Sequence, residues 1–207
     1  MVALTINFLA VTTSFALSSR DIREQHHLGA NVFWHPSSLV VPSAKGVNVS
    51  IYVSPKLALD VEYSSATLGF KFIGVEVADV NEQKVAVQIR RFFGNSFNMI
   101  FGGGHRTTET KVIDNWIDPI LGTKSKTLSK MEATYVKLGM ANQWQFGTRY
   151  TFMVDWFALE IPVDAYVTES AADSVKAEYK DDVRHTESLL RYLPSGGVLK
   201  FQVGVLF

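Results

Sequence analysis

The chain has 207 residues, of which 47% are hydrophobic and 19% are charged, and its 20 acidic side chains balance its 20 basic ones. This length suits one barrel or sandwich domain, and the balanced charge argues against a basic nucleic-acid surface and an acidic tail for a charged partner. The chain contains no cysteine, so disulfides and thiolate metal sites are excluded as well.

The first stretch of the chain indicates export. Residues 1–19 carry no charged side chain, and a mostly apolar run occupies residues 6–17. The small residues Ala16 and Ser18 have the spacing that a signal peptidase accepts, so we predict that residues 1–18 are a signal peptide cleaved after Ser18, or alternatively after Ala16. The run lacks the Lys or Arg with which a signal peptide begins, and the competing interpretation is a first buried strand.

Beyond this stretch, apolar and polar residues alternate with a period of two, the pattern of a strand whose two faces meet different surroundings. No run reaches the roughly 18 uninterrupted apolar residues of a membrane-spanning helix. The alternation predicts eight strands, at 28–34, 47–53, 57–63, 85–93, 97–102, 135–140, 150–156 and 198–207.

The connections between these strands alternate in length. Short turns are predicted near Pro55, Asn95 and Asn142. Longer connections are predicted at 36–46, 74–83, 107–130 and 168–196, the last with a loop helix over 170–192 capped by Ser170. Alternating short and long connections are typical of membrane barrels.

The last stretch shows the alternation most clearly. Its apolar positions are Leu199, Phe201, Val203, Val205 and Phe207, and the positions between them include Lys200, Gln202 and Gly204. A water-soluble protein would have to cover such an apolar face with another sheet or a helix. In a membrane barrel the apolar face meets lipid and the polar face meets the lumen, so no cover is needed.

With the apolar face outward, seven charged residues from five strands point inward: Asp60, Glu62, Arg90, Lys137, Arg149, Asp155 and Lys200. An eight-stranded barrel is only wide enough for its side chains to fill, and isolated buried charges are costly, so these groups should pair. One interpretation is a network of ion pairs that holds the barrel shut. The other is a gated or narrow polar pore, and the sequence leaves both open.

Other motifs carry less weight. Gly102-Gly103-Gly104 lacks the Lys and Ser/Thr of a phosphate-binding loop, and we expect it to serve close packing in a curved strand. The five histidines have no recurrent ligand spacing, so no metal site is predicted. No catalytic or cofactor-binding residue is predicted either.

Aromatic residues near the strand ends suit the girdles of a membrane barrel: Trp34, Tyr63, Phe93, Phe97, Tyr150, Trp156 and Phe207.

Through its alternation, turn rhythm and terminal aromatic, the chain resembles the small eight-stranded outer-membrane proteins, the OmpA-type transmembrane domain and its porin-like relatives. The resemblance covers residues 28–207. It implies an all-β fold, a closed antiparallel transmembrane barrel over residues 19–207 with short periplasmic turns and longer extracellular loops. It also implies a monomer in the outer membrane of a Gram-negative bacterium, with lipid as its main partner and a structural or narrow-pore role without enzymatic activity. The barrel-assembly machinery would read its C-terminal strand through Phe201, Val203, Val205 and Phe207.

Two alternatives remain at this point. A soluble lipocalin-like barrel that binds an apolar ligand would need the apolar face inward, with Trp156 and Phe201 inside and the charges outside. A lipid-modifying outer-membrane enzyme would need a His near the membrane surface, for which His105 or His185 with a loop serine are the candidates.

Overall fold

The computed structural model describes residues 18–38, 41–72, 75–114, 125–170 and 194–207, together with residues 181, 184, 185, 188 and 192. Strands dominate the described part of the chain. In chain order its elements are α2 (Ser19–Gln25), β1 (Leu28–His35), β2 (Ser37–Ser38), β3 (Ala44–Ser54), β4 (Leu57–Phe72), β5 (Val75–Phe92), β6 (Phe97–Asp114), β7 (Ser125–Phe146), β8 (Tyr150–Glu169) and β9 (Ser195–Leu206).

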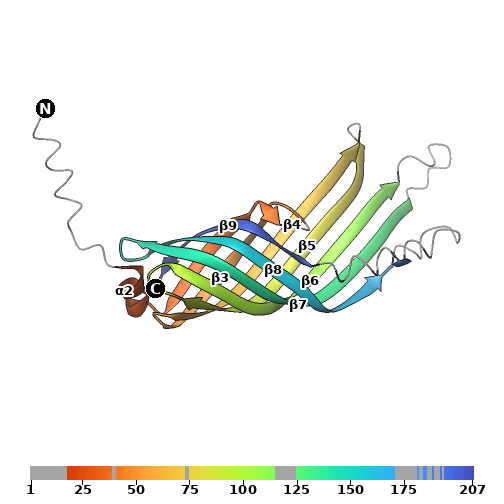
Figure 1. Cartoon of the computed structure of the whole chain (residues 1–207). Coiled ribbons are helices and arrows are strands. Elements are labelled where there is room, and N and C mark those ends of the chain that lie inside the picture. Colours follow the sequence, from red (N-terminus) through yellow and green to blue (C-terminus); the bar gives the residue numbers. More distant parts are fainter. Residues whose placement is uncertain are drawn as a thin grey trace, which may run out of the picture.

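The strands form one closed antiparallel barrel (Figure 1). Each strand from β3 to β9 pairs with its neighbour in the chain, and β1 closes the ring by pairing with both β3 and β9. The two-residue strand β2 continues β1 in the same register, because Trp34 pairs with Phe201 and Ser37 with Val198. Pro36 separates them, since a proline cannot donate to the ladder. The described residues therefore form eight barrel strands, as predicted.

The two ends of the barrel differ. The short turns at 55–56, 93–96 and 147–149 lie at the end that carries α2 and the C-terminus, which we call the turn end (Figure 1). At the opposite end, which we call the loop end, β4 to β8 extend well beyond the shorter β1, β3 and β9. Among the described residues, no helix is long and apolar enough to cross a membrane.

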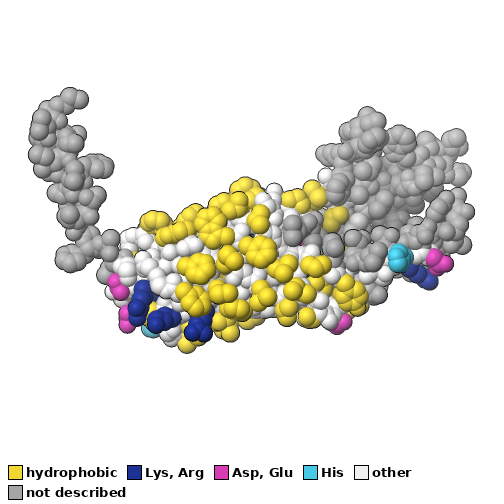
Figure 2. Space-filling view, viewed as in Figure 1, with side chains coloured by type: hydrophobic (Ala, Val, Ile, Leu, Met, Phe, Trp, Pro, Cys, Tyr) yellow, Lys and Arg dark blue, Asp and Glu magenta, His cyan; other side chains and the backbone are white. Residues whose placement is uncertain are grey.

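The wall of the barrel is apolar outside and polar inside. On β3, for example, Val49 is 47% exposed while its neighbour Ser50 is 2% exposed. Figure 2 shows hydrophobic side chains spread over the visible wall, with the charged side chains in view lying toward its ends. An apolar belt around a closed barrel has lipid as its natural surroundings. It contradicts the lipocalin-like alternative, because Trp156 is on the outside and 44% exposed.

The described residues of two predicted long connections are strand. Residues 75–83 belong to β5, and 107–114 and 125–130 belong to β6 and β7. In this region the strands have left the apolar belt, so their outward side chains are polar, such as Gln83 and Thr107. The hydrogen-bonded ladder continues there without apolar alternation, and a prediction based on alternation misses it.

The turn predicted near Asn142 is also wrong, because β7 runs on to Phe146 and the turn lies at 147–149. The amide-rich sequence before it resembles a loop, yet Gln143 is fully buried and Gln145 nearly so. In a barrel with a polar interior, amide side chains are inward-facing strand residues. Gly147, with φ of 60°, supplies the left-handed conformation that the turn needs. The loop helix predicted over 170–192 lies largely outside the described residues.

Candidate functional site: the charged barrel interior

Period-two alternation on five strands brings charged side chains to the barrel axis. Asp60 and Glu62 come from β4, Arg90 from β5, Lys137 from β7, Asp155 from β8 and Lys200 from β9. All six residues are at most 8% exposed. The seventh predicted member, Arg149, is not among them. It lies in the β7–β8 turn, where strand alternation does not apply, and its side chain is exposed.

Arg90 is the centre of one group of ion pairs. Its Nε lies 3.0 Å from Oδ2 of Asp60 on the neighbouring strand, and its Nη1 lies 3.2 Å from Oδ1 of Asp155. Asn98 accepts a further hydrogen bond from Nη1 at 2.9 Å. Because β5 and β8 are not neighbours in the sheet, the contact between Arg90 and Asp155 crosses the barrel.

Lys200 extends this group toward the loop end. Its Nζ lies 2.7 Å from Oδ2 of Asp155 and 2.8 Å from Oε2 of Glu62, and Lys137 contacts the same Glu62 oxygen at 3.4 Å. The group thus contains three cations and three carboxylates, in which each charge has an opposite charge within 4 Å. Such pairing compensates for the loss of hydration that burial imposes.

A second group lies nearer the loop end and was not predicted. Lys84 Nζ contacts Glu160 Oε2 at 2.9 Å and Glu82 Oε1 at 3.2 Å, and the Ser195 hydroxyl donates to Glu160 at 2.9 Å. Glu82 and Lys84 precede the predicted start of their strand. Counting backward from Arg90 in steps of two would have found both.

Glu160 was missed for a different reason. The register between β7 and β8 shifts where Met140 pairs with Phe157 and Ala141 with Asp155, which leaves Trp156 unpaired as a bulge. The extra residue reverses the alternation, so Asp155 and Glu160 both point inward although their numbers differ in parity. Two consecutive exposed aromatics, Trp156 and Phe157, are the sequence signal for this shift.

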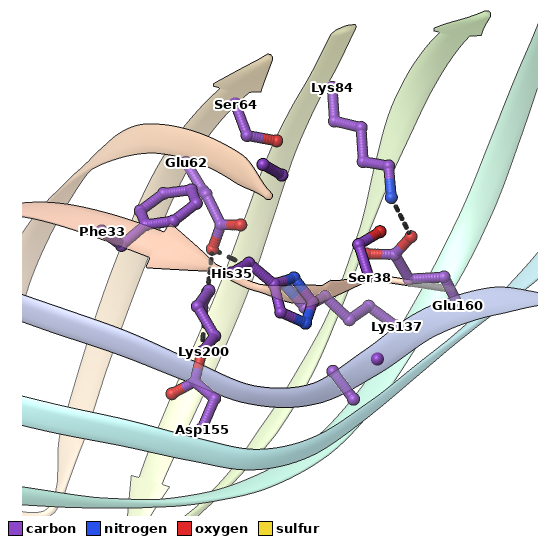
Figure 3. A pocket seen from close by; sticks show the side chains of 13 residues that line it. Phe33, His35, Ser38, Glu62, Ser64, Lys84, Lys137, Asp155, Glu160 and Lys200 are labelled. Atoms are coloured by element: carbon purple, nitrogen blue, oxygen red, sulfur yellow. Dashed lines mark hydrogen bonds and ion pairs between the residues drawn. The ribbon is translucent and has the colours of Figure 1, made fainter. Parts of the chain in front are cut away.

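Between the two groups lies a small enclosed space. Its volume is about 20 Å³, and its lining includes His35, Glu62, Lys84, Glu160 and Lys200. Figure 3 shows His35 between the Lys200–Glu62 pair and the Lys84–Glu160 pair. A space of this size holds about one water molecule. The interior at this level is therefore filled by paired side chains.

The turn end is closed by α2. Ile22, at 1% exposure, packs into a buried apolar cluster with Tyr52, Ala58, Phe92 and Leu206 at the base of the barrel. A helix this short shows no apolar periodicity in the sequence. The signal that marks it is the capping box, in which Ser18 and Asp21 bond to each other's backbone amides.

Arg23 of α2 ties two of the short turns to the last residues of β7. Its Nε donates to the carbonyl of Pro55 at 3.0 Å, its Nη2 to that of Asn95 at 3.0 Å, and its Nη1 to Oε1 of Gln145 at 3.4 Å. The guanidinium also lies 3.9 Å from the centre of the Phe92 ring. Burial lowers the pKa of Arg23 to about 10, so the side chain remains charged at neutral pH.

The C-terminal strand closes the ring. Phe207 donates its amide to the carbonyl of Leu28 at 2.9 Å, and its own carbonyl accepts from His27 and Leu28. Of the residues predicted as an assembly signal, Val203 and Phe207 are exposed on the outer wall at 52% and 66%, while Val205 is half-buried. Phe201 is also half-buried and stacks against Trp34 with 6.4 Å between the ring centres.

The remaining sequence candidates lie elsewhere. His105 is on the outer wall, with Nε2 3.4 Å from Glu132, and the carbonyl of His185 accepts from the Ser188 hydroxyl. Neither of these contacts joins a serine hydroxyl to an imidazole. A Cβ atom added to Gly104 would lie 2.6 Å from the Tyr135 hydroxyl, which agrees with the packing role expected for the glycine run. The described residues contain no group of three or more His, Asp or Glu that could hold a metal ion.

Solved structures similar to this fold include bacterial outer-membrane proteins. No family model and no curated protein sequence matches the chain. A major outer membrane protein from Thermus thermophilus is similar with a TM-score of 0.59 and 9% identity, over 87% of this chain and 98% of that one. Ail, the attachment invasion locus protein of Yersinia pestis, is similar with a TM-score of 0.50 and 9% identity, over 88% and 99%. The chain therefore has the eight-stranded transmembrane barrel fold that these outer-membrane proteins share.

Proposed function

We propose that this chain is an integral protein of the bacterial outer membrane with a structural role, a closed barrel that anchors an extended strand wall and its loops outside the cell. The observation that carries the proposal is the contrast between the two sides of the wall. The outer side is an apolar belt suited to lipid, and the inner side is filled by charge pairs that cross the barrel, such as Lys200–Glu62 between β9 and β4.

The closed interior supports a structural role over an open passage. Between the two ion-pair groups, the space beside His35 holds about one water molecule. At the turn end α2 covers the mouth with Ile22 and Arg23, both at 1% exposure. A hydrated ion would have to displace both the ion pairs and the helix. The loop end, in contrast, carries the long polar parts of β4 to β8, which suits exposure to water.

The test measures where the protein is located, whether it folds into a closed barrel, and whether it conducts ions. Expressed with its full N-terminus in a Gram-negative host, the protein is expected in the outer-membrane fraction and should migrate faster on a gel before boiling than after it. Reconstituted in a planar lipid bilayer, it should leave the membrane insulating. Recovery in the soluble fraction with no mobility change would refute the membrane barrel, and steady unitary currents would refute the structural role.

A narrow pore is the second candidate, supported by the polar interior and by the small space beside His35 between the two ion-pair groups. Under this alternative, the wild-type protein conducts, and Lys84→Met with Glu160→Gln, which removes one cross-barrel pair without adding charge, increases the unitary current. The same bilayer recording therefore separates the two candidates.

Lipid is the partner that the belt requires. We also propose that the C-terminal strand carries the signal for assembly, because Val203 and Phe207 present exposed apolar side chains at its end.

A further inference from the structure

Ser18 makes three contacts that hold the first turn of α2. Its hydroxyl accepts from the amide of Asp21 at 3.3 Å, and its amide donates to Oδ2 of Asp21 at 3.2 Å. Its carbonyl accepts from the amide of Ile22 at 3.1 Å, which is the first bond of the helix. The helix has only seven residues, so it depends strongly on these contacts.

Ser19 is a buried part of the turn end and a poor place for a chain terminus. It is 5% exposed, and its hydroxyl accepts from the amide of Gln145 at 3.1 Å. A chain that began at Ser19 would place its α-ammonium group at the positive end of the helix dipole, where a cation is unfavourable. It would also place that charge in a residue that is almost closed to water.

The closure of the barrel mouth depends on this helix. Arg23 bonds to Pro55, Asn95 and Gln145, and the amide of Arg20 donates to Oδ1 of Asn95 at 3.1 Å. Losing the cap would loosen these contacts together, because all of them come from two turns of one short helix. The position at which the export signal is cut therefore decides whether the mature protein can seal its turn end.

The sequence allows two cuts, one after Ser18 and one after Ala16, because small residues stand at the last and third-last positions in both cases. For the cut after Ala16 these residues are Ala16 and Ser14. We propose that the signal is removed after Ala16, so that the mature chain begins at Leu17 and keeps Ser18 as the cap of α2. This inference rests on the proposed export to the outer membrane.

The intact mass of the protein purified from the outer membrane tests the inference directly. The expected mass is that of residues 17–207. A mass lower by one leucine and one serine residue would mean a start at Ser19 and would overturn the proposal, as would the mass of the uncut chain. In each of these cases fractionation and heat-dependent mobility still report on the barrel itself, so failure of the cleavage site and failure of the proposed function are distinguishable.

A matched pair of variants tests the same point without a purified barrel. Ser14→Tyr places a large side chain at the third-last position of the cut after Ala16 only, and Ser18→Tyr places one at the last position of the cut after Ser18 only. We expect Ser14→Tyr either to accumulate uncut precursor at least several-fold or to move the cut to Ser18, which the mass of the product reveals, and Ser18→Tyr to be cut after Ala16 as fast as wild type. Processing of a pulse-labelled chain precedes barrel folding, so loss of the helix cap in Ser18→Tyr does not affect the readout. Accumulation by Ser18→Tyr but not by Ser14→Tyr would refute the proposal.

Discussion

Arg90 and Asp155 stand on opposite sides of the barrel, and Nη1 of the arginine lies 3.2 Å from Oδ1 of the aspartate. They are 65 residues apart in the chain and belong to β5 and β8, which do not pair with each other. The contact therefore spans the interior. The Lys200–Glu62 and Lys84–Glu160 contacts span it as well, so the walls are tied together at several heights.

Removing Arg90 should destabilise the barrel strongly. Arg90→Ala leaves Asp60 without its ion-pair partner and Asp155 with Lys200 alone, both buried in the barrel interior. Loss of one member of a buried ion pair costs about 3–5 kcal/mol. The neighbouring Arg91 points outward and only faces the Phe93 ring at 5.6 Å, so Arg91→Ala should cost about 1 kcal/mol or less. Urea unfolding of both variants in lipid vesicles measures the difference, and equal losses would contradict the buried network.

The loss of stability caused by a charged residue on the outer wall should depend on its position along the barrel axis. Val87 is an outward residue in the middle of the belt on β5, 50% exposed, and Gln83 is an outward residue of the same strand beyond the belt. Val87→Lys should lower the free energy of unfolding in vesicles by about 2–4 kcal/mol, and Gln83→Lys by about 1 kcal/mol or less. Similar effects at both positions would mean that this face of β5 does not meet lipid.

The side chain of Arg23 should hold α2 in place at the turn end. Arg23→Ala removes three hydrogen bonds and the contact with Phe92, so we expect faster amide hydrogen exchange in residues 19–25. Arg20 is the matched control, because its contact with Asn95 uses the backbone amide and its side chain is exposed. Arg20→Ala should leave exchange in α2 nearly unchanged. If Arg23→Ala behaves in the same way, the packing of Ile22 and the hydrogen bonds of Ser19 and Arg20 are enough to hold the helix in place.

The sequence was informative wherever lipid constrains it. Along the belt every second residue must be apolar, so positions such as Val49 and Val87 reveal both the strand and its orientation, and the inward position of Arg90 follows. Beyond the belt this constraint ends, which explains why Glu82 was assigned to a loop and Lys84 was left outside the predicted strand. The bulge at Trp156 then hid Glu160, because a single extra residue changes which side chains face inward.

The partners within the interior could not be predicted. Alternation shows that Arg90 and Asp155 both point inward, but whether they meet depends on the stagger between strands that are far apart in the chain. The helix α2 was missed because seven residues carry too little periodicity, and because Ser18 was interpreted as the end of an export signal. Arg149 was misplaced because a turn follows no alternation.

Phe207 offers a way to separate assembly from stability. Its side chain is 66% exposed, while its backbone closes the barrel by bonding to His27 and Leu28. Phe207→Ala keeps these backbone bonds, so the refolded protein should lose only the contact of one aromatic side chain with lipid, about 1–2 kcal/mol of unfolding free energy. In cells we expect the amount of folded barrel in the outer membrane to fall several-fold, because the assembly machinery would no longer find its terminal aromatic.

Phe146→Ala is the control, since Phe146 is 57% exposed at the same end of the barrel but lies within the chain. Heat-dependent mobility of membrane extracts measures the folded amount in both strains. Equal amounts would show that the terminal aromatic is not an assembly signal, and a large loss of stability in refolded Phe207→Ala would show that it acts by packing instead.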